Sequence, residues 1–589
     1  MTIPLRRVLM VTTTAMLAFC ASATEWHVYS AETGGMTGTQ QLTNAFKRAQ
    51  NGDTITIHAG TYNVPTEEML YRFETDAEGT LHATDGVCLY STAGNLTIQG
   101  DPTADRSAVV LSGQGAAAAT ASGQHQIMLL DGANCTVKHL TFKKGMGNAS
   151  YAIYRGGSRI NASDSWIFRR GGGLRAQKTT VVEDCVFEDC YGGQGACIYN
   201  SASATGCRFI RGNCVAQNNG GSVCEVKNLY NCYFNACGRG SVRVATVVSN
   251  CVFDTCAHVQ GGGIFHYPTG MKLMDCAFTN CTTEIFNFTA QKYMASEVSR
   301  CTFYSSSKTA YALFYTTATG IEFTAPITDC SFEGNFPLTH VTGKISHCIF
   351  KANGVPMMTA CSELEDCTVD AGGVTLTGGS TVGLVDLPAV LDVGTVRRCR
   401  LGNFSCHWAY AIKNCHRMEN SLITGTVQWG TGALFGHTDG MDATYLNCTV
   451  MTNGAMNNMF CNNAVETPGR ITVKNCLFCK NKVGGQNWGS CDSWSDDLSN
   501  VYLYNTYHHF KPTPGGSVDC FDGWRKSFDS KIRDDGTLPR RSCCVDAGTN
   551  DEWSETDIDL AGNPRINGVV DVGCFENWDP VPGMLLLLK

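Results

Sequence analysis

The sequence predicts an all-β solenoid in which short parallel strands stack rung upon rung, and three observations support this fold class. A six-residue phrase (apolar, any, polar, Cys, any, apolar) recurs thirteen times, and its step varies from 18 to 32 residues while the phrase hardly changes. Glycine accounts for 63 of 589 residues and charged residues for only 16%, which is typical of many short strands and turns. Leucine-rich and tetratricopeptide arrays hold a tighter period, so a constant strand with variable connections favours a parallel β-solenoid.

The phrase places a Cys and an apolar residue on one face of each strand, because residues two apart in a strand point the same way. Rungs of such a solenoid lie about 4.8 Å apart, so equivalent positions are expected to form files along its axis. The Cys file holds Cys185, Cys207, Cys232, Cys251, Cys276, Cys301, Cys330, Cys348, Cys367, Cys399, Cys448 and Cys476, with Ser421 and an early Leu140 in the same slot. The Phe file holds Phe187, Phe209, Phe234, Phe253, Phe278, Phe303, Phe332, Phe350 and Phe478. A third file holds Cys190, Cys237, Cys256 and Cys281, then Asn335, Asn353, Asn453 and Asn481.

Composition and charge exclude two classes of protein. The 43% of apolar residues is ample for a core and rules out general disorder. The 44 basic and 52 acidic residues give a net charge of −8, which argues against a nucleic-acid binder defined by its net charge.

The N-terminus predicts export. Arg6 and Arg7 precede a mostly apolar stretch over residues 8–20, and residues 21–23 (Ala-Ser-Ala) suit cleavage before Thr24. The apolar stretch is too short to span a bilayer, which needs about 20 residues. A lipoprotein anchored at Cys20 is the alternative, disfavoured by the Phe19 that precedes it. We therefore expect a secreted or cell-surface protein, monomeric and without a transmembrane span.

Three further groups of motifs carry a resemblance to a known family. They are an N-terminal amphipathic stretch leading into a strand (42–55 and 60–62), glycine-rich phrases between rungs (192–193, 220–221 and 261–265), and a C-terminal motif (542–548, 559–565 and 571–576). With the repeat, they resemble right-handed parallel β-helix proteins of the pectin-lyase-like superfamily. The chain is similar in particular to repeats of polymorphic outer-membrane proteins and to choice-of-anchor Q type bacterial surface proteins. It departs from the closing motif at Cys543 and Cys574, where Pro and Ala are usual.

The resemblance implies four parts of the chain. We expect a signal peptide over residues 1–23, a cap with a short helix and first strand over 24–63, a right-handed parallel β-helix over 64–500, and a closing segment over 501–589.

The resemblance covers proteins of several functions, because a shared solenoid does not fix a function. The favoured interpretation is a non-catalytic protein that contacts polysaccharides or cell-surface glycans. A polysaccharide lyase or hydrolase acting on an acidic polysaccharide is the alternative, and a structural stalk is the third. No cofactor or metal is expected, and Ca²⁺ enters only under the lyase alternative. Acidic side chains in the slot after Phe lie two or three rungs apart, about 10–14 Å, which is too far to share one Ca²⁺ ion.

One stretch of the sequence is strongly basic. Residues 143–178 contain eight basic side chains and a single acid, Asp164, and two nearby strands add more arginines. Such a stretch would attract a polyanion, although a solvated loop with scattered charge would look the same. The predicted polyanion-binding residues are Lys143, Lys144, Arg155, Arg159, Arg169, Arg170, Arg175, Lys178, Arg208 and Arg211. Trp166, Trp429, Trp488 and Trp494 are candidates for stacking on sugars, with burial in a core as the alternative.

The cysteines could be either paired in disulfides or reduced and buried. Cleavage of the signal would leave 31 of the 32 cysteines, and export normally favours disulfides. Equivalent Cβ atoms on stacked rungs run side by side near 4.8 Å, beyond the mean of about 3.8 Å found in disulfides. We therefore expect the Cys file to be reduced and buried, with Cys520, Cys543, Cys544 and Cys574 as the better candidates for bridges.

Overall fold

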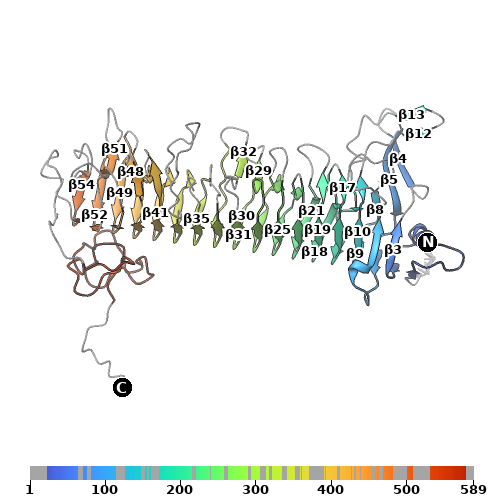
Figure 1. The fold of residues 1–589 in the computed structure, drawn as a ribbon, viewed down its shortest axis with the longest axis horizontal. Helices are drawn as coiled ribbons and strands as arrows, with labels where there is room; N and C mark the ends of the chain where they lie inside the picture. Colours follow the sequence, from blue (N-terminus) through green and yellow to red (C-terminus); the bar gives the residue numbers. More distant parts are fainter. Residues whose placement is uncertain are drawn as a thin grey trace, which may run out of the picture.

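The structure, a computed structural model, is an elongated right-handed parallel β-helix with one short α-helix near its N-terminal end (Figure 1). It describes residues 23–63, 70–75, 81–113, 126–147, 153–155, 158–160, 171–192, 194–214, 221–238, 240–243, 245–257, 263–288, 294–305, 314–316, 321–334, 338, 341–351, 358–359, 361–370, 390–391, 393–407, 411–425, 427–429, 433–437, 440–453, 458–462, 469–479, 481, 501–508 and 531–578.

Parallel strands form three stacks that run along the axis, and the second stack lies directly before the Cys file. Its strands are β1 (Glu25–Val28), β2 (Thr54–Ile57), β6 (Thr97–Gly100), β9 (Thr136–Lys138), β15 (Val181–Glu183), the second halves of β18 (Ile198–Thr205) and β21 (Val223–Tyr230), β24 (Val247–Ser249), β27 (Lys272–Met274), β30 (Glu297–Ser299), β33 (Ile327–Thr328), β35 (Lys344–Ser346), β38 (Glu363–Glu365), β41 (Thr395–Arg397), β45 (Arg417–Glu419), β49 (Ala443–Leu446), β52 (Ile471–Lys474) and β54 (Val501–Tyr504).

The third stack follows the Cys file and carries the Phe file. It comprises β3 (Gly60–Asn63), β7 (Val109–Ser112), β10 (Thr141–Lys143), β16 (Val186–Glu188), β19 (Arg208–Ile210), β22 (Tyr233–Asn235), β25 (Val252–Asp254), β28 (Ala277–Thr279), β31 (Thr302–Tyr304), β34 (Ser331–Glu333), β36 (Ile349–Lys351), β39 (Thr368–Asp370), β42 (Arg400–Gly402), β46 (Leu422–Thr424), β50 (Thr449–Met451), β53 (Leu477–Cys479) and β55 (Tyr507–His508).

The first stack begins each rung. It comprises β5 (Leu81–Ser91), which also pairs antiparallel with β4 (Leu70–Thr75), β8 (Gln126–Leu130), β14 (Leu174–Arg175), the first halves of β18 and β21, β23 (Val242–Arg243), β26 (Phe265–His266), β29 (Phe286–Phe288) and β32 (Phe314–Thr316), and then β37 (Met358–Thr359), β40 (Val390–Leu391), β44 (Ile412–Lys413), β48 (Ala433–His437) and β51 (Asn458–Asn462). Smaller pairings join β11 (Met146–Gly147), β17 (Tyr191–Gly192) and β20 (Asn213–Cys214), the hairpin β12 (Ile153–Arg155) with β13 (Ser158–Ile160), and β43 (Ser405–His407) with β47 (Val427–Trp429).

The predicted Phe file is confirmed from ring to ring. Phe234, Phe253 and Phe278 pair in register, are fully buried, and stack with ring centroids 4.6 and 4.9 Å apart. Parallel stacking at the rung spacing lets each ring fill the gap above the one below. From Phe142 to Phe350 the centre of the solenoid is therefore an aromatic column flanked by the aliphatic residues of the second stack, and Val369, Leu401, Ile423 and Val450 continue the file before Phe478.

The Cys file is also confirmed as buried thiols, and the geometry explains why a small donor suits this slot. Cys232 donates from Sγ to the carbonyl of Tyr230 (3.3 Å) in its own corner and to that of Ala204 (3.4 Å) on the neighbouring rung. Ser421 donates in the same way to the carbonyl of Glu419 (2.9 Å). Among the described cysteines, the twelve of the file are all unbridged and buried, and burial raises the pKa of a thiol such as Cys276, which keeps it unreactive.

A sharp corner separates the second and third stacks on each rung. The residue directly before the file position has a left-handed backbone, with φ values such as 55° at Asn231 and 51° at Arg300. Asn and Asp tolerate this conformation better than other side chains, which is why the polar position of the phrase is rich in them. In the third file, Asn453 and Asn481 are linked by an amide hydrogen bond of 3.0 Å, whereas Asn335 and Asn353 lie outside the described residues.

The N-terminal cap forms as predicted. Helix α1 (Gly38–Arg48) begins at Thr37, whose side chain accepts a hydrogen bond from the Gln40 amide in a capping box. Its buried face, which includes Leu42 and Phe46, packs on the first rungs.

The C-terminal region differs from the expectation in two ways. Strands β54 and β55 still pair with the rung before them, so the β-helix continues past residue 500. The described closing segment (531–578) lies against the side of the last rungs (Figure 1), where it covers outward-facing apolar residues of the third stack such as Leu477. Cys544 and Cys574 are buried thiols, so the expected bridges are absent at these two positions, and Cys520 lies outside the described residues.

Candidate functional site

A ladder of charged side chains covers the outer face of the second stack between β35 and β45. Each strand there has one inward apolar residue flanked by two outward ones, and the register aligns the outward positions from rung to rung. The charged ladder comprises Lys344, Glu363, Glu365, Arg397, Arg417 and Glu419, with the corner residues Asp366 and Arg398 beside it.

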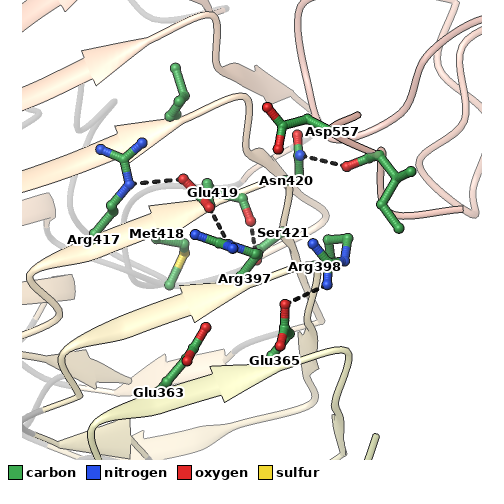
Figure 2. A network of polar contacts seen from close by, with 12 residues as sticks. Glu363, Glu365, Arg397, Arg398, Arg417, Met418, Glu419, Asn420, Ser421 and Asp557 are labelled. Carbon is green, nitrogen blue, oxygen red and sulfur yellow. Dashed lines mark hydrogen bonds and ion pairs between the residues drawn. The ribbon is translucent and has the colours of Figure 1, made fainter. Parts of the chain in front are cut away.

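Glu419 holds two arginines from successive rungs (Figure 2). Its Oε2 accepts a hydrogen bond from Nε of Arg417 (2.8 Å) on the same strand, and its Oε1 pairs with Arg397 on the strand before. The Glu419 side chain is only 5% exposed, whereas both arginines are 38% exposed. One buried carboxylate thus orients two guanidinium groups at the surface.

The other end of the ladder brings one amine to two carboxylates. Nζ of Lys344 lies 3.3 Å from Glu363 and also pairs with Glu365. Burial alone would raise the pKa of Glu365, but hydrogen bonds from Lys344 and Arg398 outweigh it, so the pKa is lowered. Glu365 is therefore ionised at neutral pH and does not have the proton that a general acid must supply.

The corner next to the ladder is closed by a bidentate ion pair. Arg398 donates to both oxygens of Asp366 at 2.7 Å and to Glu365 at 2.5 Å. These hydrogen bonds, with Asp366 first, raise the pKa of Arg398. They also compensate for the left-handed backbone of this arginine (φ 49°), which is costly for a long side chain.

The ladder as a whole is a rigid polar surface on which donors and acceptors alternate. With the two corner residues included, its four basic and four acidic residues balance, but the partly exposed Arg397 and Arg417 share a single carboxylate. That end therefore carries one more positive than negative charge, and both guanidinium groups reach the solvent. Such fixed groups recognise carboxylates and hydroxyl-rich ligands with little loss of side-chain entropy.

The predicted basic residues are partly brought together, around Glu188 of β16. Lys143 pairs with Glu188 at 3.1 Å, and Arg211 donates to Glu188 (2.5 Å) and to Asp189 (2.6 Å). The hydrogen bond from Arg211, with a smaller contribution from nearby Lys143 and Lys144, lowers the pKa of Asp189. Neighbouring rungs thus supply acidic partners to Lys143 and Arg211, and polyanion binding by the basic stretch stays a prediction.

The remaining predicted residues occupy other strands or lie outside the described part of the chain. Lys178 pairs with Glu225 (3.1 Å) at a different corner, Arg208 lies over the ring of Tyr233 (5.3 Å), and Arg175 belongs to β14. The backbones of Arg155, Arg159 and Trp429 lie in β12, β13 and β47, and nothing of their side chains is described. Arg169, Arg170, Trp166, Trp488 and Trp494 lie outside the described residues.

The charged ladder was not predicted from the sequence. A signal for it exists, since the apolar residue that opens the phrase is flanked by charges in Lys-Ile-Ser (344–346), Glu-Leu-Glu (363–365) and Arg-Met-Glu (417–419). The slot after Phe, in which acidic residues were expected, belongs to the third stack, whereas the charged ladder lies on the second.

Clusters of three or more potential metal ligands and membrane-spanning helices are both absent from the described ranges. No group of three or more His, Cys, Asp or Glu side chains there is arranged to hold a metal ion. No helix there is long and apolar enough to cross a membrane.

Comparisons with known proteins concern the fold alone. No protein-family model matches the sequence, and a search of curated proteins found no match. Among solved structures, a PL6 family alginate lyase is 12% identical with a TM-score of 0.20, the match covering 94% of this chain and 59% of that enzyme. PfbA, a surface adhesin of Streptococcus pneumoniae, is 10% identical with a TM-score of 0.25 (76% and 91% covered). A Yersinia enterocolitica family 28 exopolygalacturonase is 10% identical with a TM-score of 0.20 (84% and 79% covered).

At these values the matches carry no argument about function. The parallel β-helix rests on the strand pairing of this chain, and the more specific resemblance to polymorphic outer-membrane and choice-of-anchor Q proteins stays a prediction.

Proposed function

We propose that this protein is an exported, non-catalytic β-helix that binds acidic glycans along the charged ladder. The observation that carries the proposal is the pair of arginines, Arg397 and Arg417, held side by side by the buried Glu419. Guanidinium groups bind carboxylates through two parallel hydrogen bonds, and these two have their orientation set before any ligand arrives. Uronic acid residues of a polysaccharide present such carboxylates at regular intervals.

The shape of the solenoid supports an extended ligand. Outward positions of the second stack repeat on every rung at about 4.8 Å, so a glycan chain running along the axis meets equivalent polar groups on successive rungs. Lys344 on β35 would contact such a chain three rungs away from Arg417 on β45. Multiple weak contacts of this kind add up to useful affinity because the β-helix holds them in fixed geometry.

A panel of acidic and neutral polysaccharides tests the proposal. The intact protein is expected to bind acidic members, and Arg417→Gln is expected to weaken binding by about tenfold, the loss of one charge-assisted contact of about 1.4 kcal/mol. Arg300→Gln is the matched control, because Arg300 is an exposed arginine ion-paired to Asp275 at 2.7 Å outside the ladder. Equal binding by the intact protein and Arg417→Gln would reject the ladder as the site.

The same panel separates the proposal from catalysis. A lyase would generate unsaturated ends that absorb in the ultraviolet, and a hydrolase would release new reducing ends. Binding without either product supports the non-catalytic proposal, whereas product formation would replace it with the enzyme alternative. Failure to bind any glycan would leave the structural stalk as the better interpretation.

The basic stretch around residues 143–178 remains a second predicted polyanion site. Neutralising Arg169, Arg170 and Arg175 together is expected to reduce binding of an anionic polysaccharide while leaving stability unchanged, and that binding should weaken with salt. Binding that ignores both salt and the triple substitution would reject this site.

A further inference from the structure

Two histidines face each other on the outer surface of the first rungs. Nδ1 of His27 lies 3.2 Å from Nε2 of His58. His27 belongs to β1 and His58 directly follows β2, and the parallel register of these strands brings together residues 31 positions apart. The His27 side chain is 45% exposed and that of His58 is 25% exposed, so solvent reaches the pair.

The His58 ring is fixed on its far side. Its Nδ1 lies 2.8 Å from Oδ2 of Asp101, which follows β6 on the next rung. Thr103 donates two hydrogen bonds to Oδ1 of Asp101, which leaves Oδ2 to the Nδ1 of His58. Nε2 of His58 is the ring nitrogen that faces Nδ1 of His27.

An aromatic ring and a second carboxylate complete the surroundings. Tyr29 stacks on His58 with ring centroids 4.2 Å apart and planes inclined by only 3°, which sets the plane of the imidazole. Glu25 lies 3.7 Å from Nε2 of His27 and accepts a hydrogen bond from Thr56. Each imidazole thus has a carboxylate on the side away from the other.

We propose that His27 and His58 form a two-imidazole site for a divalent transition-metal ion. Metal–nitrogen bonds of about 2.0–2.1 Å in tetrahedral geometry place two ligand nitrogens about 3.3–3.4 Å apart, and the observed separation of 3.2 Å is close to this value. A carboxylate on the second nitrogen of a ligating histidine is the usual outer-shell arrangement, and Asp101 supplies it for His58.

The ligand set also selects the class of ion. Imidazole nitrogen suits Zn²⁺, Cu²⁺ and Ni²⁺ better than Ca²⁺ or Mg²⁺, and Cu²⁺ binds such sites most tightly. Two protein ligands leave the remaining positions to water or to a ligand from solution. Metal binding here is independent of glycan binding, because the two histidines lie on the first rungs, at β1 and β2, and the charged ladder lies on strands β35 to β45.

Metal titration of the chain without a polyhistidine tag, stripped of metals beforehand, tests the proposal. Isothermal titration calorimetry with Zn²⁺ and with Cu²⁺ is expected to show a site that His27→Gln or His58→Gln weakens by at least about tenfold, since each removes one of two ligands. Asp101→Asn keeps both ligands and is expected to weaken binding by about 10–100-fold through loss of the outer-shell carboxylate. Electron paramagnetic resonance of the Cu²⁺ form is expected to show two coordinated nitrogens.

His139 offers a matched control within the same chain. It also pairs with a carboxylate, Asp184 (2.8 Å), but its second nitrogen is occupied by the carbonyl of Ala104 (2.7 Å), so His139→Gln is expected to leave the site unchanged. An unaltered circular dichroism spectrum for each variant excludes a folding defect. Equal affinity in the intact protein, His27→Gln and His58→Gln would overturn the proposal, as would the absence of a bound ion in the intact protein.

Discussion

Truncating a ring in the middle of the aromatic column is expected to destabilise the β-helix strongly. Phe253 is fully buried and has three ring neighbours: Phe234 and Phe278 stack on its faces at 4.6 and 4.9 Å, and Phe265 meets it edge-on at 5.2 Å. Phe253→Ala removes all three contacts and leaves a cavity that the neighbouring rungs are unable to close, because their backbones are held at the strand spacing.

The magnitude follows from these contacts. A buried Phe→Ala substitution costs about 3–5 kcal/mol, and each aromatic pair adds about 0.5–1.5 kcal/mol beyond the buried area. Phe350 is the matched control, because it stacks on Phe332 at 4.7 Å on one side but faces Val369 on the next rung. With two fewer aromatic pairs than Phe253, Phe350→Ala is expected to cost about 1–3 kcal/mol less.

Chemical denaturation followed by far-ultraviolet circular dichroism measures both variants. Hydrogen exchange shows in addition whether the loss is confined to the rungs around the substitution, as expected in a solenoid whose rungs contact only their neighbours. Phe253→Asp is the stringent form, because it buries an unpaired charge and should prevent folding. A soluble Phe253→Asp variant with an unchanged spectrum, or equal costs for the two alanine substitutions, would refute the packing argument.

Three more expectations follow from the described contacts. Thiol counting in denaturant without reductant should find at least the twelve thiols of the Cys file, and the same thiols should react slowly in the native protein; a lower count would mean a disulfide-stapled solenoid. Glu419→Gln should lower the free energy of unfolding by about 1.5–3 kcal/mol through lost charged hydrogen bonds, whereas Glu297→Gln, whose Lys272 partner is 3.7 Å away and exposed, should cost under about 1 kcal/mol; similar denaturation midpoints for the two variants would contradict this. Burial raises the pKa of Asp571 to about 6 and that of Glu576 to about 8 in the closing segment, so the protonated forms favour the folded state and its stability should fall as pH rises from about 4 to 8. Hydrogen exchange of this segment at both ends of that range checks the sign, and equal or greater protection at high pH would reverse it.

Much of the fold could be predicted from the sequence because the signals are local. The Phe is the middle residue of its three-residue strand and the Cys precedes it by two positions, so local alternation places both inward. The rung spacing is a constant of backbone hydrogen bonding. The corner conformation is local too, since the left-handed backbone at positions such as Asn231 explains the polar residue before each Cys. The file position holds Cys on most rungs, Ser421 on one and Thr506 on the last. Each of these small side chains donates a hydrogen bond to a nearby backbone carbonyl.

The position of the closing segment was not predictable in this way. Its sequence resembles a terminal motif, yet it packs on the flank of the last rungs, where Leu422, Met451 and Leu477 face outward. Asn447 and Asn475 of the corner file bind its backbone through their side-chain amides. The sequence signal for this contact is the apolar residue at outward positions of the third stack. That signal predicts a covered surface but does not say that the closing segment covers it.

The sequence by itself thus determined the solenoid and its inward files, and it predicts the reduced state of the Cys file, since each depends on a few neighbouring residues and on the fixed distance between rungs. Only the tertiary structure decided which charges meet. Successive rungs repeat every 18 to 32 residues along the sequence, and only the register between their strands brings Arg397 to Glu419, Arg211 to Glu188 and His27 to His58. Ion pairs between rungs depend on how strands that are distant in the sequence align. A count of charges along the sequence does not contain that information. That is why the acidic partners of Lys143 and Lys178, like the charged ladder, were found only in three dimensions.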